Sequence, residues 1–161
     1  MFGFNKTTID LHAPFDGTVI PVNEVPDPVF AQAMVGDGFA LIPDETSDVI
    51  EVCAPADGKL VKVFNTLHAF ALVTPEGLEV LVHIGLDTVE LKGEGFTALA
   101  AVGDSVMVGQ PIIRVDAAAL RGRGTQLTTP VVMTNKKQIG RMKVSAGPAN
   151  SGAHACTVTM A

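Results

Sequence analysis

The sequence predicts an all-β domain, an antiparallel β-sandwich of the flattened-barrel or barrel-sandwich hybrid type with a few short helices. Turn signals such as Asp16-Gly17, Asp57-Gly58 and Gly103-Asp104 recur along the chain. Their spacing of roughly 8–12 residues is typical of short antiparallel strands. Hydrophobic residues make up 47% of the chain and aromatic residues only 5%, with no Trp or Tyr. We therefore expect a core of aliphatic side chains between closely packed strands.

The chain of 161 residues fits a single domain. We expect residues 1–11 to form a flexible N-terminal tail or linker and residues 12–161 to form the domain. Early in this domain lies APFDGTVIPV at 13–22, and the same turn-and-strand pattern returns as APADGKLVKV at 54–63. The repetition predicts two related halves that pack face to face.

Helices are a minor component of the prediction. Three short segments show helical spacing of apolar residues, namely 28–34 (PVFAQAM), 95–101 (GFTALAA) and 116–121 (DAAALR). The segment GDSVMVGQPIIRVD at 103–116 predicts a strand pair of the kind found in barrel-sandwich carrier domains.

The segment HAFALVTPEGLEVLVHIGLD at 68–87 predicts a β-hairpin with a histidine on each strand. If the Pro-Glu dipeptide forms its tip, His68 lies directly opposite His83, with Cβ atoms about 4.5–5.5 Å apart. A one-residue bulge at Gly77 would instead send the two side chains to opposite faces. We expect the paired register. Two facing imidazoles in an apolar hairpin cost desolvation and cannot neutralise each other, which favours a functional role.

Three chemistries use such a histidine pair. Zinc would need a further protein ligand, and Asp87, Glu79 and Glu90 are available but stand in no established ligand spacing. General acid–base catalysis would need a substrate pocket. Phosphoryl carriage needs less, since one ring nitrogen acts as the nucleophile and the second ring donates to the phosphoryl oxygens.

The surroundings favour phosphoryl carriage, because a phosphohistidine must be protected from water yet remain accessible to a partner protein. The backbone N–H groups of residues 84–86 could add an anion-binding turn. The apolar residues expected to form a partner-binding surface around the pair are Phe30, Met34, Val35, Phe64, Phe70 and Leu81.

Charge and composition exclude several other classes. Eleven Lys and Arg stand against 17 Asp and Glu, a net charge of −6, which argues against nucleic acid as a partner. No run approaches the ~20 apolar residues that span a bilayer, and no signal peptide opens the chain, so we expect a cytoplasmic location. Cys53 and Cys156 stand in no metal-binding spacing and are expected to be free thiols.

Four segments, VPDPVFAQAMVGDGFALIP, HAFAL, VLVHIGLDTVELKGEGF and TPVVMTN, closely resemble the glucose-type IIA domain of the bacterial phosphoenolpyruvate-dependent sugar phosphotransferase system. The resemblance runs from about Ala13 to Val144. Its most specific parts are VHIGLDTV and LKGEGF. Leu81 and Ile84 stand where this family often has Phe, and the segment after Val144 matches the family poorly.

The resemblance implies that His83 accepts a phosphoryl group from the carrier protein HPr and passes it to a cysteine of a sugar-specific IIB domain, for sugar uptake with concomitant phosphorylation. It implies that His68 is the catalytic partner, that Thr66 forms a hydrogen bond within the site, and that Asp87 lies beside it, where it could meet a cation on the partner.

The same resemblance implies that no metal or other cofactor is needed, because the phosphoryl group is carried covalently. The protein would reach the inner face of the membrane only through the permease. Free-standing members of the family also dock on permeases or metabolic enzymes when unphosphorylated.

Two rival functions remain open at this stage. A biotinyl or lipoyl carrier module would need a modifiable Lys, usually within Met-Lys-Met, and the sequence contains no such tripeptide. A zinc-dependent hydrolase would use His68 and His83 as metal ligands.

Overall fold

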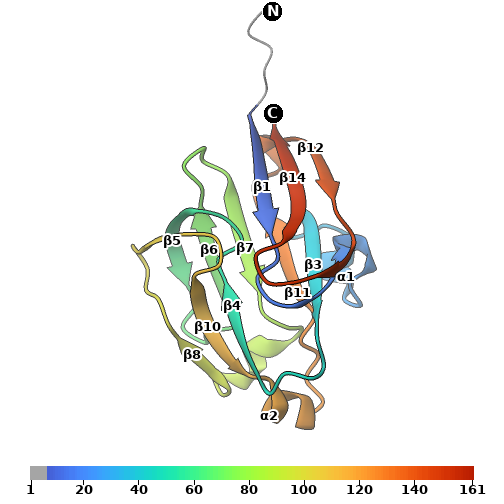
Figure 1. The fold of residues 1–161 in the computed structure, drawn as a ribbon, viewed down its shortest axis with the longest axis vertical. Helices are drawn as coiled ribbons and strands as arrows, with labels where there is room; N and C mark the ends of the chain where they lie inside the picture. Colours follow the sequence, from blue (N-terminus) through green and yellow to red (C-terminus); the bar gives the residue numbers. More distant parts are fainter. Residues whose placement is uncertain (1–6) are drawn as a thin grey trace, which may run out of the picture.

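The computed structural model describes residues 7–161, which form three antiparallel β-sheets with two short α-helices (Figure 1). The largest sheet has the strand order β13-β2-β3-β11-β7-β6-β5-β9, and the smaller ones have the orders β4-β10-β8 and β1-β14-β12. The strands are β1 (Thr8–His12), β2 (Gly17–Pro21), β3 (Asp37–Pro43), β4 (Val49–Cys53), β5 (Gly58–Val63), β6 (Ala69–Val73), β7 (Glu79–His83), β8 (Phe96–Ala98), β9 (Ser105–Val106), β10 (Pro111–Asp116), β11 (Thr129–Met133), β12 (Ile139–Val144), β13 (Gly147–Ala149) and β14 (His154–Met160). The predicted all-β antiparallel class is confirmed. The sheets of residues 7–161 keep free edges and do not close into one barrel.

The helices are α1 (Pro28–Ala31) and α2 (Ala117–Gly122), with 3₁₀ turns η1 (Val22–Glu24), η2 (Thr88–Leu91) and η3 (Lys136–Gln138). Helix α2 confirms the prediction for 116–121, and α1 occupies only the first half of 28–34. The helix predicted at 95–101 is wrong: after Gly95, which has a φ of +90°, the chain continues as β8 and pairs with β10. Tertiary pairing overrides a helical pattern this short.

The expected boundary of the N-terminal tail is wrong in part. Residues 1–6 lie outside the described part of the chain, but Thr8–His12 forms β1, which pairs with β14 and buries Ile9 and Leu11. The segment after Val144, poorly matched by the resemblance, folds as β13 and β14, and β14 is the central strand of its sheet. The folded unit therefore includes both ends of the described chain, which lie side by side in Figure 1.

The two sequence repeats occupy matching positions in the fold. Cys53 N–H donates to Pro14 O at 2.9 Å, and His12 N–H donates to Pro55 O at 2.8 Å, so the two copies exchange reciprocal backbone hydrogen bonds. In each copy the repeat's Asp accepts a backbone N–H from a distant loop: Asp16 from Ser151, and Asp57 from Val108. These bonds support the predicted relation between the two halves.

The predicted strand pair at 103–116 exists only as two separate strands. Strand β9 pairs with β5, whereas β10 lies between β4 and β8. The prediction that these two strands pair with each other, as in a carrier domain, is therefore wrong.

One large apolar cluster fills the space between the sheets and contains residues such as Phe39, Leu60 and Ile112, all fully buried. A smaller cluster centred on Phe30 and Val132 lies beneath α1. This second cluster supports the loops that surround the histidine pair. Among the described residues, no helix has the length and apolar character needed to cross a membrane.

Candidate functional site

The β6–β7 hairpin does not have the predicted register. Ala69 is opposite His83 and Val73 is opposite Glu79, one position away from the expected pairing. The tip contains an extra residue, because Gly77, with a φ of +94°, donates its N–H to Thr74 O at 2.9 Å. The structure thus has the one-residue bulge that we considered less favourable.

The two histidines nevertheless meet, because His68 precedes β6 and does not follow its alternation. Leu67 has a φ of +59° and closes a turn by donating its N–H to Phe64 O at 2.8 Å. The backbone of His68 still joins the hairpin, since its carbonyl accepts the Ile84 N–H at 2.6 Å. The ring centroids of His68 and His83 lie 5.1 Å apart at an interplanar angle of 76°.

A single hydrogen bond determines which ring nitrogen of His83 carries the hydrogen. Its Nδ1 lies 2.8 Å from the carbonyl oxygen of Gly85, and a carbonyl only accepts, so Nδ1 carries the hydrogen. Nε2 then keeps a free lone pair when the ring is neutral. Burial lowers the pKa of His83 from its ordinary value of 6.5, while the Gly85 carbonyl and the carboxylates of Asp27 and Asp87 oppose this shift. The site therefore favours the neutral, nucleophilic ring near pH 7.

His68 is held by its neighbour Thr66, whose Oγ1 lies 2.6 Å from Nδ1. Burial and the nearby His83 lower the pKa of His68, so this ring is also favoured in its neutral form. If the Thr66 hydroxyl donates to Nδ1, the hydrogen of His68 stands on Nε2 and is free to donate. The edge of the ring packs against Phe64 at a centroid distance of 5.3 Å.

The apolar residues expected around the site divide into two groups. Phe30 in α1 contacts the His83 ring at a centroid distance of 4.9 Å, and Leu81 and Val35 pack against the smaller cluster beneath it. Met34 is 66% exposed. Phe70, however, is fully buried in the main core, so its expected place on a partner-binding surface is wrong. With the observed register, Phe70 points to the opposite face of the hairpin from His83.

The expected anion-binding turn at residues 84–86 is also wrong, because its three N–H groups already have acceptors. Ile84 donates to His68 O, Gly85 lies within 3.4 Å of Thr129 Oγ1, and Leu86 donates to Gln126 O at 3.0 Å. The turn holds the histidines in place and has no free donor for a bound anion.

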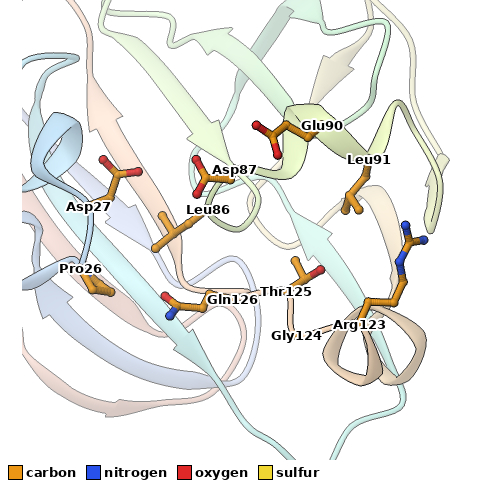
Figure 2. A pocket seen from close by; sticks show the side chains of 10 residues that line it. All are labelled: Pro26, Asp27, Leu86, Asp87, Glu90, Leu91, Arg123, Gly124, Thr125 and Gln126. Atoms are coloured by element: carbon orange, nitrogen blue, oxygen red, sulfur yellow. The ribbon is translucent and has the colours of Figure 1, made fainter.

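An acidic hollow of ≈ 500 Å³ adjoins this turn. Figure 2 shows the carboxylates of Asp27, Asp87 and Glu90 along one side and Arg123 at the far end. Arg123 forms an ion pair of 3.1 Å with Glu94. The hollow therefore offers negative charge beside His83.

Sequence reasoning missed Asp27 as a site residue. Its side chain accepts the Val29 N–H at 2.9 Å as the N-cap of α1. The Asp-Pro pair that opens α1 was a readable capping signal. Its proximity to His83 depends on tertiary structure and is not visible in the sequence.

The described residues contain no group of three His, Cys, Asp or Glu side chains arranged to hold a metal ion. Both cysteines are free, as expected, and the structure buries both. Burial raises the pKa of Cys53 and that of Cys156, the latter to about 12. Neither thiol is primed as a nucleophile.

The chain is similar to known proteins over most of its length. Residues 9–139 match the family model described as phosphoenolpyruvate-dependent sugar phosphotransferase system, EIIA 1. A protein of Borreliella burgdorferi named PTS system glucose-specific EIIA component is 45% identical over 145 residues, which cover 89% of this chain and 75% of that protein. The protein of the same name from Halalkalibacterium halodurans is 41% identical over 150 residues, which cover 93% and 84%. The solved structure of glucose permease IIA from Mycoplasma capricolum superimposes with a TM-score of 0.85 at 37% identity and covers 98% of this chain and 99% of that one. The chain belongs to the EIIA 1 family of the phosphoenolpyruvate-dependent sugar phosphotransferase system, whose members are phosphocarriers in sugar uptake.

Proposed function

We propose that the chain carries its phosphoryl group on Nε2 of His83, accepts it from a phosphohistidine of HPr, and passes it to a cysteine of a sugar-specific IIB domain. The observation that supports this most is the Nδ1–H bond from His83 to the Gly85 carbonyl, which leaves Nε2 as the nucleophile. The relatives are named glucose-specific, and we propose glucose as the sugar.

In the acceptance step, the lone pair of Nε2 attacks phosphorus in line, a new N–P bond forms, and the N–P bond of the donor histidine breaks with its electron pair returning to the donor ring. The hydrogen on Nδ1 stays bound to the Gly85 carbonyl throughout. In the second step, a thiolate of the IIB domain attacks phosphorus and an S–P bond forms. The Nε2–P bond breaks with its electron pair returning to Nε2, which restores the neutral ring of His83. No metal or other cofactor is required for this exchange.

His68 is placed to assist through its Nε2 hydrogen. Because the Thr66 hydroxyl occupies Nδ1, Nε2–H can donate to a phosphoryl oxygen attached to the neighbouring ring. A hydrogen bond to a charged acceptor is roughly twice as strong as a neutral one. Neutral rings also suit this role, since neither histidine repels a cation on the partner.

The surface around His83 suits partner proteins of two kinds. Asp27 and Asp87 offer negative charge to a cation on HPr or the IIB domain. Val29, Met34 and Val89 are large apolar residues that remain exposed on α1, the turn after it and η2. The unphosphorylated surface is therefore suited to regulatory docking on permeases or metabolic enzymes. Phosphorylation would add about −1.5 to −2 charge there and weaken such docking.

We propose that this exchange takes place in the cytoplasm, with the membrane reached only through the permease. The structure does not support a biotinyl or lipoyl carrier module, because β9 and β10 pair with other strands and do not form the expected hairpin. It does not support a zinc hydrolase either, because residues 7–161 contain no group of three side chains arranged to hold a metal ion.

The decisive experiment is intact mass spectrometry after incubation with phosphoenolpyruvate, enzyme I and HPr, comparing wild type with His83→Ala and His68→Ala. We expect wild type and His68→Ala to gain one acid-labile phosphoryl group and His83→Ala to gain none. If wild type gains no mass while HPr in the same tube is phosphorylated, the proposed function is wrong.

A further inference from the structure

The carbonyl of Gly85 determines which nitrogen of His83 carries the hydrogen. The position of this carbonyl depends on contacts made by the backbone on either side of it. Gly85 has a φ of +76°, a conformation that non-glycine residues rarely adopt. A Cβ at this position would lie 2.6 Å from Cγ2 of Thr88 and 2.9 Å from Gln126 O. The backbone at Gly85 is thus tightly packed on one side. The hydrogen bonds of the neighbouring peptide groups hold it in this conformation.

Two buried threonine hydroxyls hold the peptide group that precedes this carbonyl, the one joining Ile84 and Gly85. Its carbonyl accepts from Thr88 Oγ1 at 2.5 Å, and its N–H lies 3.4 Å from Thr129 Oγ1. Both threonine side chains have no exposed surface. The hydrogen of the Thr129 hydroxyl is donated to Leu127 O at 2.9 Å, so its oxygen is oriented to accept.

The next peptide group, joining Gly85 and Leu86, is held in the same way. Its N–H donates to Gln126 O at 3.0 Å, and its carbonyl accepts from Nδ1 of His83. Rotation of the first peptide group would rotate the second and move the carbonyl away from the imidazole. A buried hydroxyl that only filled space would be costlier than the isosteric valine, since it must be hydrogen-bonded to offset its desolvation.

We propose that Thr88 and Thr129 are positioning residues for phosphoryl transfer, which fix the Ile84–Gly85 peptide so that the Gly85 carbonyl keeps the hydrogen of His83 on Nδ1. The effect on transfer rate rests on the proposed function. The effect on the position of the hydrogen does not, because it is a property of the unphosphorylated protein.

The test uses Thr129→Val, which removes the hydroxyl and keeps the shape, and Thr129→Ser, which keeps the hydroxyl. Nitrogen-15 NMR of the His83 ring in the unphosphorylated protein reports which nitrogen is protonated. We expect Thr129→Val to show a mixture of the two tautomers and to accept phosphoryl from HPr about fivefold more slowly, the factor that one ordinary hydrogen bond is worth. Thr129→Ser should restore the wild-type spectrum and rate. Thr88→Val and Thr88→Ser form an independent second pair.

Thr74 provides the matched control on the same hairpin. It is 4% exposed, and its Oγ1 accepts the Leu78 N–H at 3.1 Å near the tip, away from the histidines. Thr74→Val should lower stability without changing the His83 spectrum. The proposal is overturned if both valine variants at 88 and 129 keep the wild-type spectrum, if the serine variants change it as much, or if Thr74→Val changes it equally. A wild-type protein that shows the Nδ1–H tautomer but accepts no phosphoryl group would instead refute the proposed function.

Discussion

Replacing His68 by Gln separates the two steps of the proposed phosphoryl exchange. The His68 ring lies 5.1 Å from the His83 ring and is held by Thr66. Gln is similar in size, so the packing against Phe64 is largely kept, but the oriented ring N–H is lost. A hydrogen bond to a charged group contributes about 1.5–3 kcal/mol, which corresponds to roughly 10- to 150-fold in rate.

We expect this loss to fall mainly on transfer from His83 to the IIB domain, because in the proposed mechanism His68 donates a hydrogen bond to the phosphoryl group as it departs. Rapid-quench measurements would follow a single turnover from phosphorylated protein to a purified IIB domain, and acceptance from HPr would be measured separately. Thr66→Val is the matched comparison: it keeps both imidazoles and frees Nδ1 of His68, so we expect the same pattern with a smaller loss of about fivefold. Full-rate relay to the IIB domain by His68→Gln, or an equal loss in both steps, would refute this assignment of His68.

Three further predictions concern charge, protonation and packing. Asp27→Asn together with Asp87→Asn should slow association with HPr severalfold at low salt and weaken its salt dependence, measured by stopped-flow; an unchanged salt dependence would contradict the docking role. His83→Gln should flatten the pH dependence of stability below about pH 6.5. The pKa of His83 in the folded protein lies below 6.5, so the unfolded chain binds the proton first as pH falls. The contribution of His83 to wild-type stability is therefore full above this value and is lost as pH falls toward the folded pKa. Urea unfolding at about pH 7.5 and 5.5 gives the pH dependence of stability for each protein, and an equal dependence in wild type and variant would argue against the lowered pKa of His83. Phe70→Ala should lower the free energy of unfolding by about 3–5 kcal/mol in denaturant titrations while the folded fraction still accepts phosphoryl at the wild-type rate, and a slower rate at unchanged stability would return Phe70 to the contact surface.

The fold class was predictable because it depends on local, repeated signals. Turns at regular spacing and runs of β-branched residues are read within a few positions. The repeats at 13–22 and 54–63 reappear as two equivalent turn-and-strand units, and reciprocal backbone hydrogen bonds connect the segments where they begin. The segment at 95–101 shows the limit of such signals. Its helical pattern is only about two turns long, and pairing with β10 outweighs it.

The identities of the paired histidines were predictable, but the geometry that brings them together was not. The expected register and the expected alternation at His68 are both wrong, and the two errors cancel. A bulge at Gly77 shifts the strands by one position, and the turn ending at Leu67 changes the direction of the next side chain. Both depend on single residues with positive φ, which a pattern of apolar and polar letters does not record.

Two of the residues that sequence reasoning missed, Asp27 and Thr129, lie in segments distant from His83 along the chain. Asp27 belongs to the cap of α1, and Thr129 begins β11, 46 positions after His83 in the numbering. Both residues lie in segments that resemble the family, but neither is near His83 in the sequence. One influences the pKa of His83, and the other holds the backbone beside its hydrogen-bond acceptor. A phosphocarrier needs a nucleophile that is neutral, has its free lone pair on one nitrogen and lies near a surface. In this fold, these three requirements are met by burial beneath α1, by the Gly85 carbonyl, and by the outward face of β7.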